Sequence, residues 1–220
     1  LILTNFRCYA SLHLNINTSI ITLTGENGAG KTNLLEAISL LVPGRGLRAA
    51  RLEDLVHIGK GPSQNWAVAA TVEGLDGVYE VGTGVANGAD IERPRRVVRI
   101  NGATARGQAA LGERLSILWL TPDMQRIFND GASGRRRFLD RLVFGFDAAH
   151  AGRLKAFERA MRERSNLLKR HIVYGAAADP AWFDALEKTI VEKGVAITAA
   201  RIALINRLNP ACAMGVGPFP

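Results

Sequence analysis

The sequence is poor in cysteine and in clustered histidine. Cys8 and Cys212 are its only cysteines, and they have no partners at metal-ligand spacing. We interpret them as reduced thiols, because disulfides form mainly in oxidising compartments. The histidines are scattered and none pairs at a spacing that binds metal: His13, His57, His150 and His171. These absences argue against a disulfide-stabilised secreted domain and against a zinc site.

Long apolar segments are also absent. The apolar runs are far shorter than the roughly 20 residues that a membrane-spanning helix needs. The chain has no charged-then-apolar secretory leader and no internal repeat or low-complexity segment. We therefore expect no membrane association and a cytoplasmic location.

Acidic residues are scarce in one region only. The chain has 28 Lys and Arg against 20 Asp and Glu, a formal net charge of +8. Residues 133–172 hold 11 of the basic residues and only 4 of the acidic ones, so nearly all of the excess lies there. A basic excess gathered in one segment predicts a polyanionic partner such as nucleic acid.

Apolar periodicity predicts an α/β order. Strands are expected at residues 1–3, 12–16, 20–24, 67–72, 78–85, 95–100 and 116–121. Helices are expected at residues 33–42, 135–146 and 149–173, and a last helix is expected to end before Pro210. The predicted organisation is a lobe over residues 1–147 with a mixed sheet and an antiparallel meander, a helical hairpin over 148–210, and a truncated tail over 211–220. The first residue already lies in a strand-like run, so we expect a piece of a longer polypeptide.

A phosphate-binding loop follows the run at 20–24. Glycines allow a backbone that turns N–H groups inward, and the N-terminus of the following helix also favours an anion. Lys31 is expected to contact the β- and γ-phosphates, and the Thr32 hydroxyl is expected to ligate Mg²⁺. The sequence thus predicts a site for ATP and Mg²⁺ in a loop that matches G-x-x-x-x-G-K-[ST] at every fixed position: Gly25, Glu26, Asn27, Gly28, Ala29, Gly30, Lys31 and Thr32.

Short motifs surround this loop in a fixed order. They read LTNFRCY (3–9), NLLEAI (33–38), GRGLR (44–48), RING (99–102), LTPD (120–123), GASGRRRFLD (131–140) and RSNLLK (164–169). In this order and at these distances the series resembles the RecF family of bacterial DNA replication and repair proteins. The resemblance runs from residue 1 to about residue 210.

The resemblance implies an α/β fold, the ABC-type P-loop ATPase head of the SMC-like proteins, here incomplete and with an inserted helical lobe. It also implies an ATP-binding protein that forms an ATP-dependent homodimer and binds DNA, single-stranded or as gapped duplex, at single-strand gaps. RecR and RecO are the implied protein partners, and the implied roles are loading of RecA and support of the SOS response.

Two family features are missing or open. No apolar strand ending in paired acids (Walker B) follows Thr32, and no ABC signature loop is present. Since positioning and charge stabilisation supply most of phosphoryl-transfer catalysis, we expect a weak ATPase in the longer protein and negligible turnover by this chain, with no catalytic residue of its own. The residue that would contact Mg²⁺ and water where the helical lobe begins is either Asp123 or Gln125.

Several other polar residues are candidates for contacts with phosphate. Arg7 and Asn33 are candidates for the nucleotide, whereas Glu36 fits a structural polar contact. Arg45 and Arg48 follow the first helix in a Gly-flanked loop and are candidates for phosphate or DNA.

A run of arginines is the main candidate for DNA. Guanidinium groups suit phosphate recognition, so Arg135, Arg136 and Arg137 are proposed to contact DNA. Salt bridges from this run to Asp140 or Asp147 are the structural alternative. Weaker candidates for the same contact are Arg93, Arg95, Arg96 and Arg99.

Two other functions compete with repair. A P-loop kinase acting on a small metabolite would need an arginine-bearing lid and would turn over as a monomer, and the long helical hairpin fits it poorly. A folding remnant without activity would gain no stability from Mg-ATP, unlike a true binder.

Overall fold

The structure is a computed structural model that describes residues 1–59, 65–74, 77–86, 95–122, 124, 127, 129, 131–174 and 179–215. The chain divides into two compact units, Leu1–Trp119 and Leu120–Pro220. The helix that begins at Ala132 therefore belongs to the second unit, although the sequence places a lobe boundary at residue 147. The division of the longer protein into lobes stays a prediction.

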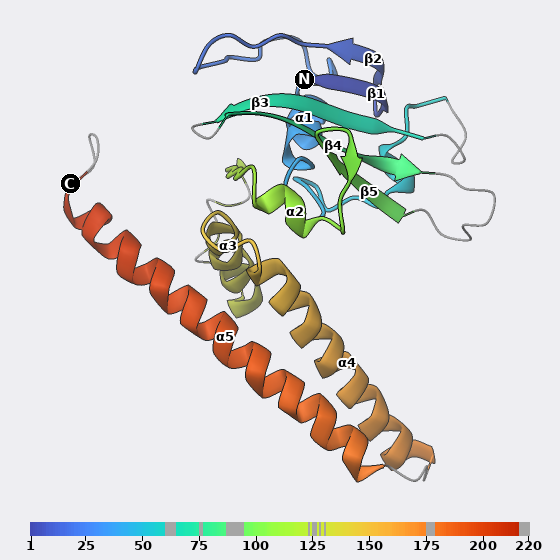
Figure 1. Cartoon of the computed structure of the whole chain (residues 1–220), viewed down its shortest axis with the longest axis vertical. Coiled ribbons are helices and arrows are strands. Elements are labelled where there is room, and N and C mark those ends of the chain that lie inside the picture. The colour runs from blue at the N-terminus through green and yellow to red at the C-terminus, as the bar shows by residue number, and fades with distance from the viewer. Residues whose placement is uncertain are drawn as a thin grey trace. The chain divides into compact units, whose positions relative to one another are not determined.

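The first unit contains a six-stranded sheet in the order β2-β1-β3-β4-β5-β6. All of its strand pairs are antiparallel. The predicted meander is confirmed as β3 (Ala67–Gly74), β4 (Gly77–Ala86) and β5 (Arg95–Ile100). The sheet also contains β1 (Ile2–Phe6), β2 (Tyr9–His13) and β6 (Ala103–Thr104). The same unit contains α1 (Lys31–Ser39), η1 (Glu53–Leu55) and α2 (Ala109–Gly112) (Figure 1).

Two predicted strands do not form. Residues 20–24 and 116–121 have no ladder partner in the part of the chain that the structure describes, and the predictions of strands there are wrong. Ile20 is 85% exposed and Leu120 is 77% exposed. A β-branched run becomes a strand only where another strand satisfies its backbone groups, and no described strand pairs with either run.

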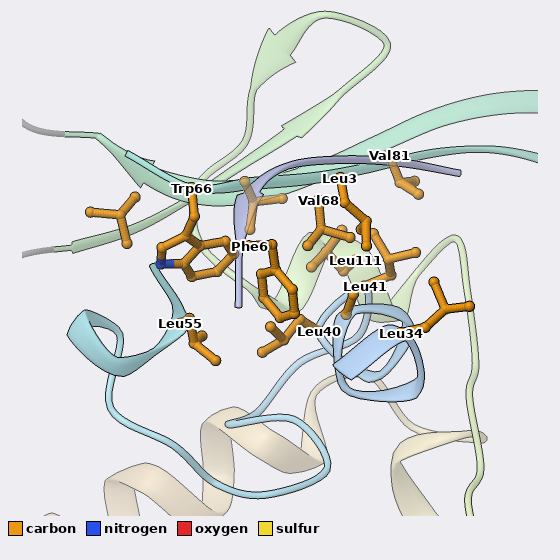
Figure 2. Close-up of a cluster of buried hydrophobic side chains, with 13 residues drawn as sticks. Leu3, Phe6, Leu34, Leu40, Leu41, Leu55, Trp66, Val68, Val81 and Leu111 are labelled. Carbon is orange, nitrogen blue, oxygen red and sulfur yellow. The ribbon is translucent and has the colours of Figure 1, made fainter. Parts of the chain in front are cut away.

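The core of the first unit lies between the sheet and α1. Figure 2 shows Leu3, Val68 and Val81 of the sheet facing Leu40 and Leu41 at the end of α1. Phe6 meets Trp66 edge to face, with ring centroids 5.6 Å apart. This packing fixes α1, and with it the preceding loop, against the strands β1 and β3.

The second unit is helical. It contains α3 (Ala132–Phe144), α4 (His150–Tyr174) and α5 (Pro180–Ala213), and α4 and α5 lie side by side (Figure 1). Asp179 caps α5 by accepting a hydrogen bond from the Ala181 N–H at 2.9 Å. The prediction that this helix ends before Pro210 is wrong, because Pro210 removes one N–H donor but its carbonyl still accepts from the Met214 N–H at 3.1 Å. No helix among the described residues is both long and apolar enough to span a membrane.

Candidate nucleotide-binding site

The phosphate loop has the backbone conformation that its glycines predict. Gly25, Gly28 and Gly30 have φ values of +142°, +89° and +96°. Residues with a Cβ atom are strained at these positive φ values, so the backbone conformation alone favours glycine at these three positions. Residues 25–29 are exposed, whereas Gly30 is buried.

The N-terminus of α1 directly follows the loop. Gly30 is the N-cap residue, and no side-chain cap is found for this helix among the described residues. The first N–H groups of a helix have no intrahelical partner, so they and the helix dipole favour an anion at this position. The loop and the helix end together form the expected cradle for phosphate.

Lys31 lies over the loop that precedes it. Its Nζ donates to the carbonyl oxygens of Gly25 at 2.7 Å and Glu26 at 2.8 Å. The ammonium group is thus held at the mouth of the loop, where it can exchange two carbonyl oxygens for phosphate oxygens. The Thr32 side chain is exposed on the first turn of α1, as a Mg²⁺ ligand would need to be.

Arg7, Asn33 and Arg48 meet around Glu36. The Glu36 side chain is 1% exposed and accepts from Arg7 Nε at 2.9 Å and Nη2 at 3.0 Å. Arg48 Nη1 donates to Glu36 Oε2 at 3.2 Å, the oxygen that also accepts from Arg7 Nε, and to Asn33 Oδ1 at 2.9 Å. Arg7 Nη1 also donates to the carbonyl of Asp54 at 2.7 Å. Glu36 thus makes the structural contact expected of it, whereas the nucleotide contact proposed for Arg7 stays a prediction.

The remaining candidates for contact with phosphate or Mg²⁺ are Arg45, Asp123 and Gln125. Arg45 is exposed and lines a cavity of about 540 Å³ together with Arg51, Glu53 and Gln108. Asp123 and Gln125, the alternative residues for contact with Mg²⁺, lie outside the described residues. Within the described ranges no group of three carboxylate, histidine or cysteine side chains could hold a metal ion.

The prediction that Arg96 contacts DNA is wrong, because its side chain does not face solvent. Its guanidinium turns inward and donates to Thr83 Oγ1 at 2.7 Å and Gln108 Oε1 at 3.0 Å. It also donates to the carbonyls of Leu40, Val42 and Gly44, just beyond the C-terminal end of α1. Burial lowers the pKa of Arg96 to about 10, although the group stays charged at neutral pH. Arg95 and Arg99 are exposed, and Arg93 lies outside the described residues.

The arginine run of the second unit is exposed on the first turns of α3. Arg135, Arg136 and Arg137 are all exposed. The salt bridges considered as their alternative role are made by other residues instead. Asp147 pairs with Arg153, and Asp140 accepts from Arg201 Nε and Nη2, each at 2.8 Å.

Asp140 joins the three helices of the second unit. Besides Arg201 of α5 it accepts from Nε2 of the fully buried His150 of α4, at 2.8 Å. Burial alone would raise the pKa of Asp140, but the hydrogen bonds from His150 and Arg201 and their charges lower it. The sequence analysis did not predict this cluster of Asp140, His150 and Arg201. The one signal in the sequence was that Asp140 is an acidic residue on the apolar side of α3.

The solvent face of α4 carries further positive charge. Lys155, Arg159, Arg162, Lys169 and Arg170 are exposed and recur at spacings that place them on one side of the helix. Arg159 and Arg162 have intrahelical partners in Glu163 at 2.8 Å and Glu158 at 3.8 Å. Exposed pairs of this kind are weak, so the face keeps its positive character.

Comparison with known proteins identifies the family. A sequence profile of the RecF/RecN/SMC N-terminal domain matches residues 1–124, more than half of the chain. The chain belongs to this family. The resemblance inferred from the motifs is therefore confirmed.

Relatives within the RecF/RecN/SMC family extend over the whole chain. DNA replication and repair protein RecF of Mesorhizobium japonicum is 46% identical over 222 residues, which cover 100% of this chain and 56% of the relative. The protein of the same name from Rhizobium johnstonii is 44% identical over 94% of this chain and 53% of its own length. The chain spans about half the length of the curated relatives it matches.

Solved structures agree on the fold. Two structures of the recombination mediator protein RecF in the RecFOR pathway, one described as RecF-ATPrS and one as RecF-ATP, match with TM-scores of 0.81 and 0.78. Each is 24% identical and covers 94% of this chain and 53% of its own. The predicted fold class, an α/β ABC-type P-loop ATPase head with a helical lobe, is confirmed.

Proposed function

We propose that this chain binds ATP with Mg²⁺ and forms part of an ATP-dependent DNA-binding protein of recombinational repair and replication. The observation that carries the proposal is the loop of residues 25–32, in which three glycines with positive φ lead into an uncapped helix with Lys31 held at the mouth. Gly25, Glu26, Asn27, Gly28, Ala29, Gly30, Lys31 and Thr32 form the phosphate and Mg²⁺ site. Membership of the RecF/RecN/SMC family favours this function over a metabolite kinase.

The role of the longer protein is part of the proposal. It acts in the cytoplasm as an ATP-dependent homodimer at single-strand gaps in DNA, beside RecR and RecO, assists the loading of RecA and supports the SOS response. Support comes from relatives that are named DNA replication and repair proteins. Its ATPase is weak, and the present chain contributes binding rather than turnover.

Nucleotide binding is tested by thermal unfolding of the 220-residue chain. A ligand that binds only the folded form at 100 times its Kd adds about 2.7 kcal/mol of stability, which for this size corresponds to a rise in Tm of about 5–10 °C. We expect that rise with Mg-ATP and a smaller one when EDTA removes the metal. An unchanged Tm at millimolar Mg-ATP would leave only the folding-remnant interpretation.

The DNA contact is assigned to the basic surface of the second unit. It comprises Arg135, Arg136 and Arg137 of α3 and extends along the exposed face of α4 described above. Asp140 and Asp147, the carboxylates weighed as partners of this run, pair with Arg201 and Arg153. Arg45 and Arg48 are proposed as further contacts from the first unit. The partner is the phosphate backbone of single-stranded or gapped DNA.

Replacing Arg135, Arg136 and Arg137 together by glutamine is expected to lower DNA affinity at least tenfold and to weaken its salt dependence. Each lost phosphate contact removes about 0.7–0.9 from the slope of log K against log salt, so the slope should fall by about 2. Fluorescence anisotropy at several salt concentrations measures both quantities. A charge-matched control replaces Arg106, Lys188 and Lys193. If the two triple variants lose affinity equally, only net charge matters and the assigned surface is wrong.

A further inference from the structure

The turn between β1 and β2 lies against the phosphate loop. Phe6 pairs with Tyr9 across the hairpin, so Arg7 and Cys8 form the two-residue turn, and Arg7 has a φ of +53°. Three successive residues of this hairpin contact three positions on one side of α1 and its N-cap. Arg7 pairs with Glu36, Cys8 Sγ accepts from Asn33 Nδ2 at 3.1 Å, and Tyr9 Oη donates to the Gly30 carbonyl at 3.2 Å.

The side chains of Cys8 and Tyr9 approach Gly30 closely. A Cβ atom at Gly30 would lie 2.7 Å from Cys8 Sγ and 2.7 Å from Tyr9 Oη. Glycine at this position is therefore favoured by the close approach of the two side chains as well as by its φ of +96°. The last peptide of the phosphate loop is packed directly against the Tyr9 hydroxyl.

Two donors fix the direction of this peptide. The Gly30 carbonyl accepts from Tyr9 Oη and from the Leu34 N–H at 3.0 Å, the first hydrogen bond of α1. A trans peptide is planar, so the Lys31 N–H points opposite to that carbonyl and out of the N-terminal end of the helix. That end is where the anion is expected.

We propose that Tyr9 is a positioning residue for nucleotide binding, whose hydroxyl orients the Gly30–Lys31 peptide so that the Lys31 N–H faces the phosphate. The inference rests on the proposed function of this loop. Tyr9 does not touch the nucleotide in this proposal and acts through the Gly30 carbonyl. Its ring is held independently, since it is half-buried and packs against the core of the first unit.

The protonation of Tyr9 agrees with this role. Burial and the neighbouring Cys8 raise the pKa of the Tyr9 phenol above its usual value. The hydroxyl therefore remains a donor over the whole physiological range, as the carbonyl of Gly30 requires.

The test is Tyr9→Phe, which removes the hydroxyl and keeps the ring. We expect the Tm without nucleotide to change by no more than about 2 °C and the Kd for Mg-ATP to rise about three- to tenfold, the effect of one hydrogen bond. Tyr79→Phe, in β4 of the same sheet, is the matched control and should leave the Kd unchanged. Kd is measured by titration with a fluorescent ATP analogue and, independently, from the ATP-induced rise in Tm.

Each outcome decides a different point. An unchanged Kd in Tyr9→Phe, with normal binding by the wild type, would overturn the positioning role alone. A fall in the Tm without nucleotide large enough to account for the weaker binding would reduce Tyr9 to a packing residue. Failure of the wild-type chain to bind Mg-ATP would overturn the proposed function and this inference with it.

Discussion

Lys31→Ala is expected to lower the affinity of the chain for Mg-ATP about a hundredfold or more. Lys31 supplies a side-chain cation at the mouth of the loop, and charge-assisted hydrogen bonds contribute about 1.5–3 kcal/mol each. Losing about 3 kcal/mol corresponds to a factor of about a hundred in Kd. The ATP-induced rise in Tm should then disappear at concentrations that stabilise the wild type.

The stability of the unliganded chain should hardly change in this variant. The two hydrogen bonds of Lys31 join exposed groups of the same loop, so water replaces them at small cost. Lys188→Ala, an exposed lysine of α5, is the matched control and should bind Mg-ATP normally. Normal Mg-ATP binding by Lys31→Ala would show that the nucleotide site has been misplaced.

Arg96→Met is expected to lower the free energy of unfolding by about 3 kcal/mol. Methionine fills part of the space, but the oxygens of Thr83, Gln108, Leu40, Val42 and Gly44 lose a shared donor. Each buried acceptor left without a partner costs about 1–3 kcal/mol. The adjoining cavity of about 540 Å³ can admit water to some of them, which keeps the total well below a simple sum.

Chemical denaturation measures this loss. Arg99→Met is the control, because Arg99 is an exposed neighbour on the same strand and its replacement should change stability by no more than about 0.5 kcal/mol. Arg96→Lys should fall between the two, since an ammonium group keeps the charge but has three donors instead of five. Equal stability of the Arg96 and Arg99 variants would mean that the buried hydrogen bonds contribute nothing.

The sequence predicts the local parts of this fold well. The phosphate loop, α1 and the strands β3, β4 and β5 follow from patterns that lie within a few residues of one another, and the structure has all of them. Such patterns report backbone preference and the side that faces the core. The same information was enough to place Gly25, Gly28 and Gly30, whose positive φ values follow from the motif.

Apart from the end of α5, which runs past Pro210, the failures concern partners that are distant in the chain. The runs at 20–24 and 116–121 have strand-like composition, but a strand also needs a neighbour to pair with, and composition does not supply one. Arg96 looked like its exposed neighbours Arg95 and Arg99 until the fold brought it to the end of α1, more than 50 residues earlier. Asp140 likewise meets Arg201 across 61 positions. Periodicity contains no information about such pairs.

The attachment of α1 has a mechanical consequence. Arg7, Cys8 and Tyr9 of the first hairpin contact its N-terminal half, and Arg96 of β5 donates to the backbone just past its C-terminal end. A helix of nine residues is about 13 Å long and stiff along its axis, because every turn is closed by backbone hydrogen bonds. Lys31 and Leu40 therefore cannot move independently. We therefore expect a displacement of the loop on phosphate binding to be resisted both by the first hairpin and by β5, the far strand of the meander.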